Sequence, residues 1–265
     1  MKHNLSPTLI QLDGPAAGGI LWVKLNRPQS GNSLHPDLVR ELLDIIRWAN
    51  STPEIQIIIL TGNGRFFCTG MDLSRDKELS FAPGDDFHQL NKALILTEKI
   101  LIAAVNGPAI GYGATVLALC DLVYAVPDAY FFTPFVKWGM VPEAASSVSF
   151  PRLMGHQRAS LLCLTGERIW APEARELGLV SKVLPAEAFL GQVAEIAAGL
   201  SELPVGSLLE TKRLLRKTVT KDLLDANDRE CEVIVGERIP SGDLQRGREK
   251  FQAIQRAKSK RESAL

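Results

Sequence analysis

The chain has 265 residues, of which 46% are hydrophobic and 23% are charged, and these proportions are typical of a globular protein with a substantial core. Thirty basic side chains balance thirty acidic ones, so the chain as a whole has no attraction for nucleic acid or for an anionic membrane surface. We therefore expect no nucleic-acid partner, although the overall balance leaves room for a local charged patch.

Segments typical of strands and helices alternate as far as residue 185. The predicted strands cover residues 20–25, 55–60, 102–105, 122–126 and 130–132. One predicted helix begins at Pro36 and has an apolar stripe at 3.6-residue spacing, a second covers residues 87–100, and a short third begins at Ala114. This alternation predicts an α/β fold.

Beyond residue 185 the strand signals stop, and four helices are predicted. They cover residues 186–200, 205–219, 223–238 and 244–258. We therefore predict a core over residues 1–200 and a helical C-terminal region over residues 201–265, with Leu203-Pro204 between the last helix of the core and the first helix of that region.

The cysteines, the start of the chain and the apolar segments bear on the cellular compartment of the protein. Four cysteines, Cys68, Cys120, Cys163 and Cys231, form no C-x-x-C pair and have no histidine at ligand spacing, which favours reduced thiols inside the cell and predicts no metal site. The start of the chain lacks the apolar segment of a signal peptide. The most apolar window, residues 102–126, is broken by polar residues, Pro108 and three glycines, so we expect no membrane span.

Two glycine-bearing turns carry the strongest chemical signal. Residues 66–73 follow the predicted strand 55–60, and residues 106–113 follow the predicted strand 102–105. Neither Gly62-Asn63-Gly64 nor Gly111-Tyr112-Gly113 is followed by the third glycine of a G-x-G-x-x-G dinucleotide loop. Two such turns can each present one backbone N–H to the same oxygen, which is the arrangement of an oxyanion hole.

Four ordered motifs resemble those of the enoyl-CoA hydratase/isomerase (crotonase) superfamily. They are N-R-P with N-S-L at residues 26–34, F-C-T-G-M-D-L at 67–73, N-G-P-A-I-G-Y-G at 106–113, and L-T-G-E with L-G-L-V at 164–180. The resemblance implies a crotonase-type spiral of ββα repeats with a helical C-terminal region, a homotrimer or hexamer, and an acyl-CoA thioester as substrate. It implies no cofactor, because coenzyme A is part of the substrate.

Within the superfamily, the residues resemble the Δ3,Δ2-enoyl-CoA isomerases, chiefly the peroxisomal type. The two positions at which hydratases carry glutamates are Thr115 and Phe135 here. The stretch at residues 133–143 is instead similar to the T-P-F…P-E of the isomerases, and the resemblance makes Glu143 the catalytic base. Those isomerases usually have glycine next, whereas this chain has Ala144.

The resemblance also implies the binding residues. The backbone N–H groups of Met71 and Tyr112 are the expected oxyanion donors. The expected substrate-binding residues are Cys68, Thr69, Gly70, Met71, Asp72, Leu73, Gly111 and Phe135. A hydratase-like enzyme, a specialised crotonase of a secondary pathway and an inactive acyl-CoA-binding or interaction module remain alternatives, because fold alone does not fix function.

Two surface features complete the expectations. The final tripeptide, Ser-Ala-Leu at residues 263–265, resembles the peroxisomal S-K-L address, so we expect a peroxisomal location, with the cytoplasm as the alternative. A basic cluster on a predicted helix, Lys212, Arg213, Arg216 and Lys217, is either a contact for the phosphates of coenzyme A or an ordinary exposed face.

Overall fold

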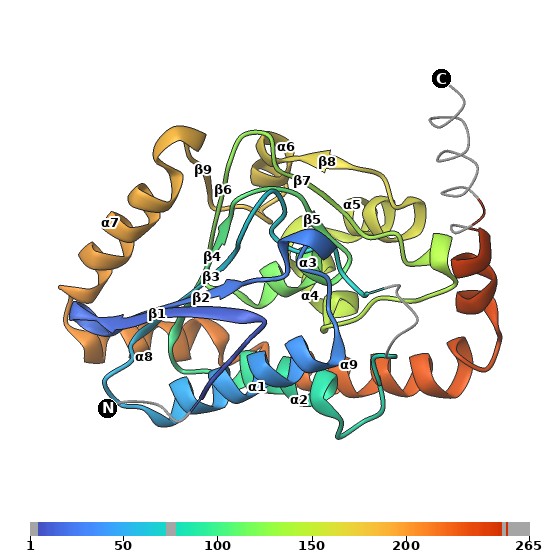
Figure 1. Cartoon of the computed structure of the whole chain (residues 1–265), viewed down its shortest axis with the longest axis horizontal. Coiled ribbons are helices and arrows are strands. Elements are labelled where there is room, and N and C mark those ends of the chain that lie inside the picture. The colour runs from blue at the N-terminus through green and yellow to red at the C-terminus, as the bar shows by residue number, and fades with distance from the viewer. Residues whose placement is uncertain (1–4, 73–77, 251–252, 254–265) are drawn as a thin grey trace.

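A six-stranded sheet forms the centre of the fold (Figure 1). The computed structural model describes residues 5–72, 78–250 and 253. The strands are β1 (Ile10–Ala16), β2 (Ile20–Leu25), β3 (Ile57–Gly62), β4 (Ile100–Val105), β6 (Leu122–Ala125) and β9 (Lys182–Val183), in the order β1-β2-β3-β4-β6-β9. β1 pairs with β2 in antiparallel fashion, and the other neighbours are parallel. β3 and β4 are buried along their whole length, as expected for central parallel strands.

A smaller sheet lies beside the first. It contains β5 (Ala109–Ile110), β7 (Tyr130–Phe132) and β8 (Ile169–Trp170) in the order β5-β7-β8. Isolated parallel bridges join Cys68 to Ala109 and Leu34 to Met71, so the chain segments that follow successive strands of the large sheet run alongside one another. The fold is therefore a mixed α/β spiral, and the two glycine-bearing turns predicted from the sequence lie next to each other.

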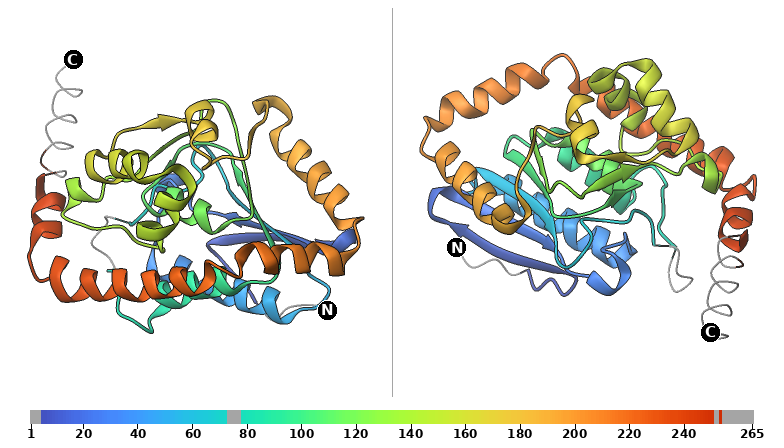
Figure 2. Two further views of the ribbon diagram at one scale, coloured as in Figure 1. Left: turned by 180° about the vertical axis from the view of Figure 1, so that it is seen from behind. Right: turned by 90° about the horizontal axis from the view of Figure 1, so that it is seen from above.

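Nine α-helices surround the sheets in the described part of the chain. They are α1 (Pro36–Ser51), α2 (Asp86–Leu96), α3 (Tyr112–Thr115), α4 (Ser146–Met154), α5 (His156–Ser160), α6 (Ala171–Glu176), α7 (Phe189–Ser201), α8 (Val205–Arg216) and α9 (Thr220–Val233). α1, α2 and α9 run side by side along one face of the molecule (Figures 1 and 2). The apolar stripe of α1 is buried as its spacing predicts, with Leu38, Leu42 and Ile46 almost inaccessible to solvent.

Several segments differ from the sequence prediction. The helix predicted over 87–100 ends at Leu96, because Thr97 is extended and the amide of Ile100 donates to the carbonyl of Gln56 in the sheet. β1 was not predicted, since it is an edge strand in which only Ile10 is buried. The two-residue strands β8 and β9 were missed as well, because so short a segment carries no periodicity.

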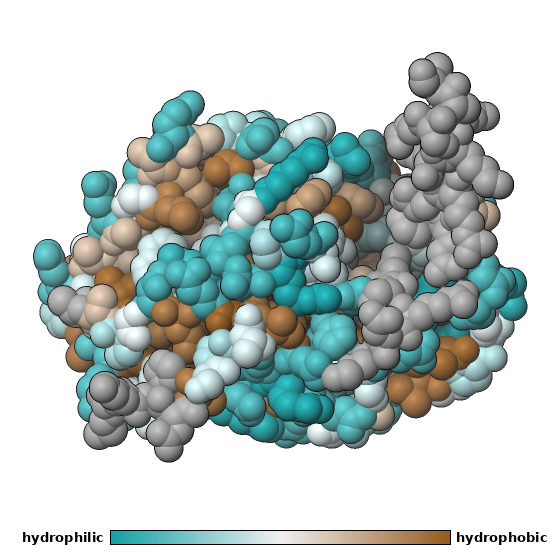
Figure 3. Space-filling model, in the orientation of Figure 1, coloured by the Kyte–Doolittle hydropathy of each residue, from teal (hydrophilic) through white to brown (hydrophobic). Residues whose placement is uncertain are grey.

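The C-terminal helices follow the predicted pattern with shifted ends. α8 ends at Arg216 and α9 begins at Thr220, and residues 243–250 are helical. Among the described residues no helix is both long enough and apolar enough to cross a membrane. On the face seen in Figure 3, hydrophilic and hydrophobic side chains are interspersed, in keeping with the balanced charge of the chain.

Candidate active site

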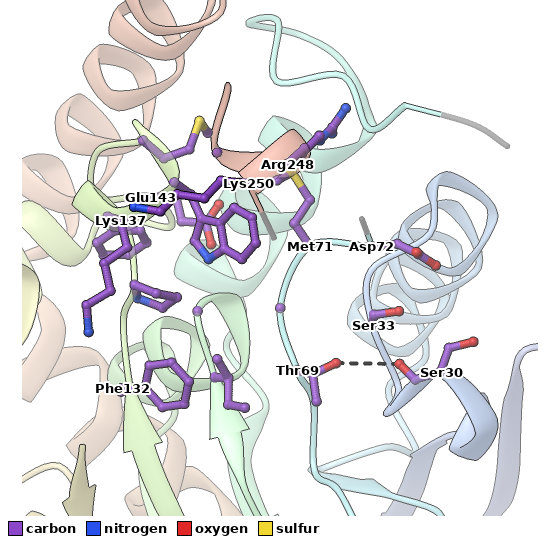
Figure 4. A pocket seen from close by; sticks show the side chains of 18 residues that line it. Ser30, Ser33, Thr69, Met71, Asp72, Phe132, Lys137, Glu143, Arg248 and Lys250 are labelled. Carbon is purple, nitrogen blue, oxygen red and sulfur yellow. Dashed lines mark hydrogen bonds between the residues drawn. The ribbon is translucent and has the colours of Figure 1, made fainter. Parts of the chain in front are cut away.

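A cavity of about 890 Å³ opens between the two glycine-bearing turns and the segment that precedes α4. In Figure 4, Ser30, Ser33, Thr69, Met71 and Asp72 lie along one wall. Phe132, Lys137 and Glu143 lie along the opposite wall, and Arg248 and Lys250 approach from the C-terminal helical segment. The cavity is therefore built from segments of the chain that are far apart in the sequence.

The first turn passes very close to the second at Gly70. Gly70 has φ +81°, and a Cβ atom there would lie 2.8 Å from the carbonyl oxygen of Ile110 and 3.4 Å from the amide nitrogen of Tyr112. Gly111 also has a positive φ, of +55°. Glycine at position 70 is therefore required both by its backbone conformation and by the close approach of the two turns.

The amides of Met71 and Tyr112 are left available by the pairing of the turns. The amide of Leu34 donates to the carbonyl of Gly70, and the amide of Asp72 donates to the carbonyl of Leu34, so the bridge beside Met71 does not use the N–H of Met71. Tyr112 is the first residue of α3, whose N–H has no intrahelical acceptor. Within the described residues neither N–H has an acceptor, and Gly70 and Gly111, the residues before them, both line the cavity.

Glu143 is the acidic side chain set deepest in the cavity wall. Its side chain is only 7% exposed, and it lies between the short 3-10 helix Val136–Trp138 and α4. Burial raises the pKa of Glu143 from 4.5 to about 8, and the negative charge of nearby Glu230 contributes to the same shift. A carboxyl group with a pKa near the working pH can take up a proton and release it again.

The turn after Glu143 has an unusual backbone. Ala144 and Ala145 have φ values of +55° and +59°, which is the left-handed region that favours glycine. Both residues are buried, and Ala145, at the N-cap position of α4, has no side chain with which to cap the helix. The carboxylate of Glu230 on α9 caps the N-terminus of α4 instead. Its Oε2 accepts a hydrogen bond from the amide of Ala145 at 2.7 Å, and its Oε1 accepts one from the amide of Ser147 at 2.8 Å.

The positions that carry glutamates in hydratases hold no carboxylate here. Thr115 is fully buried, and its hydroxyl donates to the carbonyl of Tyr112 at 3.2 Å. Phe135 is 5% exposed and lines the cavity. The cavity wall around Glu143 is thus apolar on the side that Phe135 and Trp138 form.

The other predicted binding residues fall into distinct groups. Thr69, Gly70, Met71, Asp72, Gly111 and Phe135 line the cavity. Cys68 is buried behind it, and burial raises the pKa of its thiol to about 12, so the thiol stays protonated. Leu73 lies outside the described residues.

Asp72 is engaged in an ion pair at the edge of the cavity. The guanidinium of Arg27 lies 2.8 Å from Oδ2 of Asp72 and donates at 2.7 Å to the carbonyl of Ser33. Asp72 and Arg27 therefore hold the N-R-P and N-S-L segment against the first turn.

The predicted basic cluster is divided between two environments. Lys212 is buried and lies 2.6 Å from Asp121, and Arg216 also contacts Asp121 at 3.2 Å. Arg213 is exposed and pairs with Glu210. Lys212 and Arg216 therefore fasten α8 to the core, and the alternative of a coenzyme A contact does not fit these two residues. No group of three potential metal ligands occurs in the described parts of the chain.

Sequence reasoning missed several residues of the cavity. Ser30, Ser33, Phe132, Lys137, Trp138 and Arg248 line it. The two serines lie within the N-R-P and N-S-L segment, so this motif could have been used to predict them as cavity residues. Arg248 had no such signal, because it reaches the cavity only through the packing of the segment after α9, where it pairs with Glu78 at 2.7 Å.

The raised pKa of Glu143 predicts how stability depends on pH. Between pH 4.5 and about 8 the unfolded chain loses the proton of this carboxyl group and the folded chain keeps it, so the free energy of unfolding falls as the pH rises. The slope contributed by one proton is at most about 1.4 kcal/mol per pH unit. We expect Glu143→Gln to remove this slope, so that the variant gains stability over the parent chain from pH 5 to pH 8.

Urea unfolding of both proteins across this range measures the difference. Glu173→Gln is the matched control, because Glu173 is exposed on α6. Parallel curves for the parent chain and the Glu143 variant would contradict a raised pKa at Glu143.

Comparison with known proteins bears on the family and the fold of the chain. The family model "Enoyl-CoA hydratase/isomerase" matches residues 16–258. A solved enoyl-CoA hydratase/isomerase from Pseudoalteromonas atlantica superposes with a TM-score of 0.86 and 32% identity, and the match covers 93% of this chain and 97% of that one. The crotonase-type fold predicted from the motifs is therefore confirmed.

Two relatives of known sequence are also similar. An uncharacterized protein of Caenorhabditis elegans is 38% identical over 80% of this chain and 84% of its own length. Human enoyl-CoA delta isomerase 2 is 34% identical over 82% of this chain, and the match spans 57% of the human protein. The chain belongs to the enoyl-CoA hydratase/isomerase family and is similar to its enoyl-CoA delta isomerases.

Proposed function

We propose that this chain is a Δ3,Δ2-enoyl-CoA isomerase, which moves a double bond from C3 to C2 of an acyl-CoA thioester. The observation that carries the proposal is the buried carboxyl group of Glu143 in the wall of a cavity that Met71 and Gly111 also line. Among the described residues, the amides of Met71 and of Tyr112, the residue after Gly111, have no acceptor. Threonine and phenylalanine at the two hydratase positions leave no second carboxylate at those positions to orient a water molecule.

In the proposed reaction, the Glu143 carboxylate removes a proton from C2 of the 3-enoyl thioester. The electron pair of the broken C–H bond joins the C3–C4 double bond to form a dienolate, whose negative charge rests on the thioester oxygen. The same carboxyl group then delivers its proton to C4, and the double bond remains between C2 and C3. No atom is gained or lost, so no cofactor is needed beyond the coenzyme A of the substrate.

The backbone donors act on the dienolate. The N–H groups of Met71 and Tyr112 would donate to the thioester oxygen, and each such donor contributes on the order of 3–4 kcal/mol to transition-state stabilisation. Their positions are fixed by backbone pairing of the two turns, so they need no rearrangement as charge develops. Below about pH 8 the uncharged form of Glu143 predominates, so only a fraction of the free protein carries the base.

Three further expectations belong to the same proposal. We propose that the protein assembles as a homotrimer or hexamer and works in the peroxisome, with the cytoplasm as the alternative location. The address tripeptide 263–265 lies outside the described residues. The acyl chain is expected to lie along the apolar side of the cavity formed by Phe132, Phe135 and Trp138.

The test is a spectrophotometric assay with 3-enoyl-CoA substrates of several chain lengths. We expect the absorbance of the conjugated 2-enoyl thioester to appear. A parallel reaction with 2-enoyl-CoA should leave that absorbance unchanged, since loss of the conjugated signal would instead reveal a hydratase. Tight acyl-CoA binding without turnover at any chain length would favour a binding or interaction module and overturn the isomerase proposal.

A further inference from the structure

A second buried carboxylate, that of Glu230, lies against the turn that follows Glu143. Glu230 is on α9, is only 6% exposed, and places both carboxylate oxygens against the turn that carries Glu143. Its partners are the amides of Ala145 and Ser147, which are 85 and 83 residues away in the sequence. Burying a carboxylate is costly, so a buried carboxylate with two backbone donors has a specific task.

The turn needs an external restraint. Ala144 and Ala145 both occupy the left-handed region, where a Cβ atom is disfavoured, and two such residues in succession would relax in the absence of a compensating interaction. Neither alanine can supply a hydrogen bond from its side chain. The amides of Ala145 and Ser147 both donate to the carboxylate of Glu230, and these two hydrogen bonds hold the turn at the start of α4.

The position of Glu143 depends on this turn. Glu143 immediately precedes Ala144, and the amide of Ser146 donates to the carbonyl of Glu143 at 3.1 Å. The backbone of Glu143 is therefore part of the same turn as Ala144 and Ala145. A change of the left-handed dihedrals at 144 or 145 would swing the Glu143 side chain relative to the Met71 and Tyr112 amides across the cavity. The distance over which a base acts is short, so a small displacement lowers the rate steeply.

We propose that Glu230 is a positioning residue, which fixes the catalytic carboxyl group of Glu143 by clamping the left-handed Ala144–Ala145 turn from α9. The inference rests on the proposed function, because it assigns Glu230 a role in the same reaction. Glu230 is not among the residues that line the cavity, so we expect no contact between it and the substrate.

Two substitutions separate the geometry of the clamp from its charge. Glu230→Asp keeps the charge but shortens the side chain, so it cannot reach both amides. Glu230→Gln keeps the length but sets an NH2 group against one of the amides. We expect each variant to lower kcat about 10- to 100-fold while KM stays within about threefold. Glu232→Gln is the matched control, because Glu232 is an exposed glutamate on the same helix, and it should behave as the parent chain.

A rescue experiment distinguishes positioning from simple helix capping. Ala144→Gly removes the Cβ that makes the left-handed conformation unfavourable. Placed on the Glu230→Gln background, it should restore kcat about fivefold, whereas on the parent background it should change kcat less than twofold. If Glu230→Gln lowers only thermal stability and leaves kcat unchanged below its melting temperature, Glu230 is a structural cap and the proposal is wrong.

Hydrogen exchange gives a readout that does not depend on the reaction. Peptides spanning residues 143–149 should exchange at least tenfold faster in Glu230→Gln than in Glu232→Gln. If the parent chain has no isomerase activity but this acceleration is observed, the proposed function fails and the clamp stands. If the parent chain is active and neither kcat nor exchange responds to Glu230, the clamp fails and the proposed function stands.

Discussion

Glu143→Gln should abolish isomerase activity while leaving acyl-CoA affinity almost unchanged. The substitution keeps the size of the side chain and removes the only group in the proposed mechanism that can accept the C2 proton. General base catalysis is worth about 10²- to 10⁴-fold, and here the same group also returns the proton, so we expect kcat to fall at least a thousandfold. Binding should change by less than about tenfold, equivalent to 1.4 kcal/mol.

The expectation for affinity follows from the burial of Glu143. With a pKa of about 8, the carboxyl group is largely uncharged at neutral pH, so an uncharged amide of the same shape leaves the cavity nearly as it was. A fall in kcat at constant affinity is the signature of an interaction that matters only in the transition state. Stopped-flow or steady-state assays with 3-enoyl-CoA measure kcat, and calorimetry with a saturated acyl-CoA measures the affinity.

Two controls make the result decisive. Glu173→Gln removes an exposed carboxylate on α6 and should retain full activity. Phe135→Glu on the Glu143→Gln background places a carboxylate at the hydratase position and should not restore isomerisation, because Phe135 lies elsewhere on the cavity wall. Retention of more than about a tenth of the activity by Glu143→Gln would disprove the proposed base.

The local parts of the site could be predicted from the sequence because each motif is a short continuous segment. The turn around Gly70 and the turn around Gly111 were expected to meet, and their backbones do so, since the amide of Ile110 donates to the carbonyl of Cys68 at 2.8 Å. Most of the residues named for binding line one cavity with Glu143. The roles of these residues in catalysis stay predictions until they are measured.

The parts that depend on packing between distant segments could not be predicted. Glu230 had no motif, since its partners at the start of α4 are 83 and 85 residues away. Arg248 reaches the cavity for a similar reason, through the turn of the chain after α9. The helix predicted to run to residue 100 was too long, because Thr97, Glu98 and Lys99 between α2 and β4 include no glycine or proline to mark the end of the helix. The hydrogen bond from the amide of Ile100 to the carbonyl of Gln56 shows where the strand begins.

Gly70→Ala should be nearly as damaging as the loss of the base, for a geometric reason. A Cβ at this position would lie 2.8 Å from the carbonyl oxygen of Ile110, which is a backbone atom and cannot simply rotate away. The two turns must then separate, and the Met71 and Tyr112 amides, which we propose donate to one oxygen, would be moved apart. Loss of a single oxyanion donor costs about 10²- to 10³-fold, so we expect kcat/KM to fall at least a hundredfold.

The matched control is Gly155→Ala. Gly155 has the same φ of +81°, but a Cβ there would meet nothing within 4 Å. Both variants therefore bear the cost of an unfavourable backbone conformation, and only Gly70→Ala also forces the two turns apart. Urea unfolding shows whether both proteins are folded under the assay conditions, and kcat/KM with 3-enoyl-CoA is then compared. If the two variants lose activity equally, the loss comes from backbone strain alone, and the close approach of the two turns at Gly70 is not what aligns the oxyanion donors.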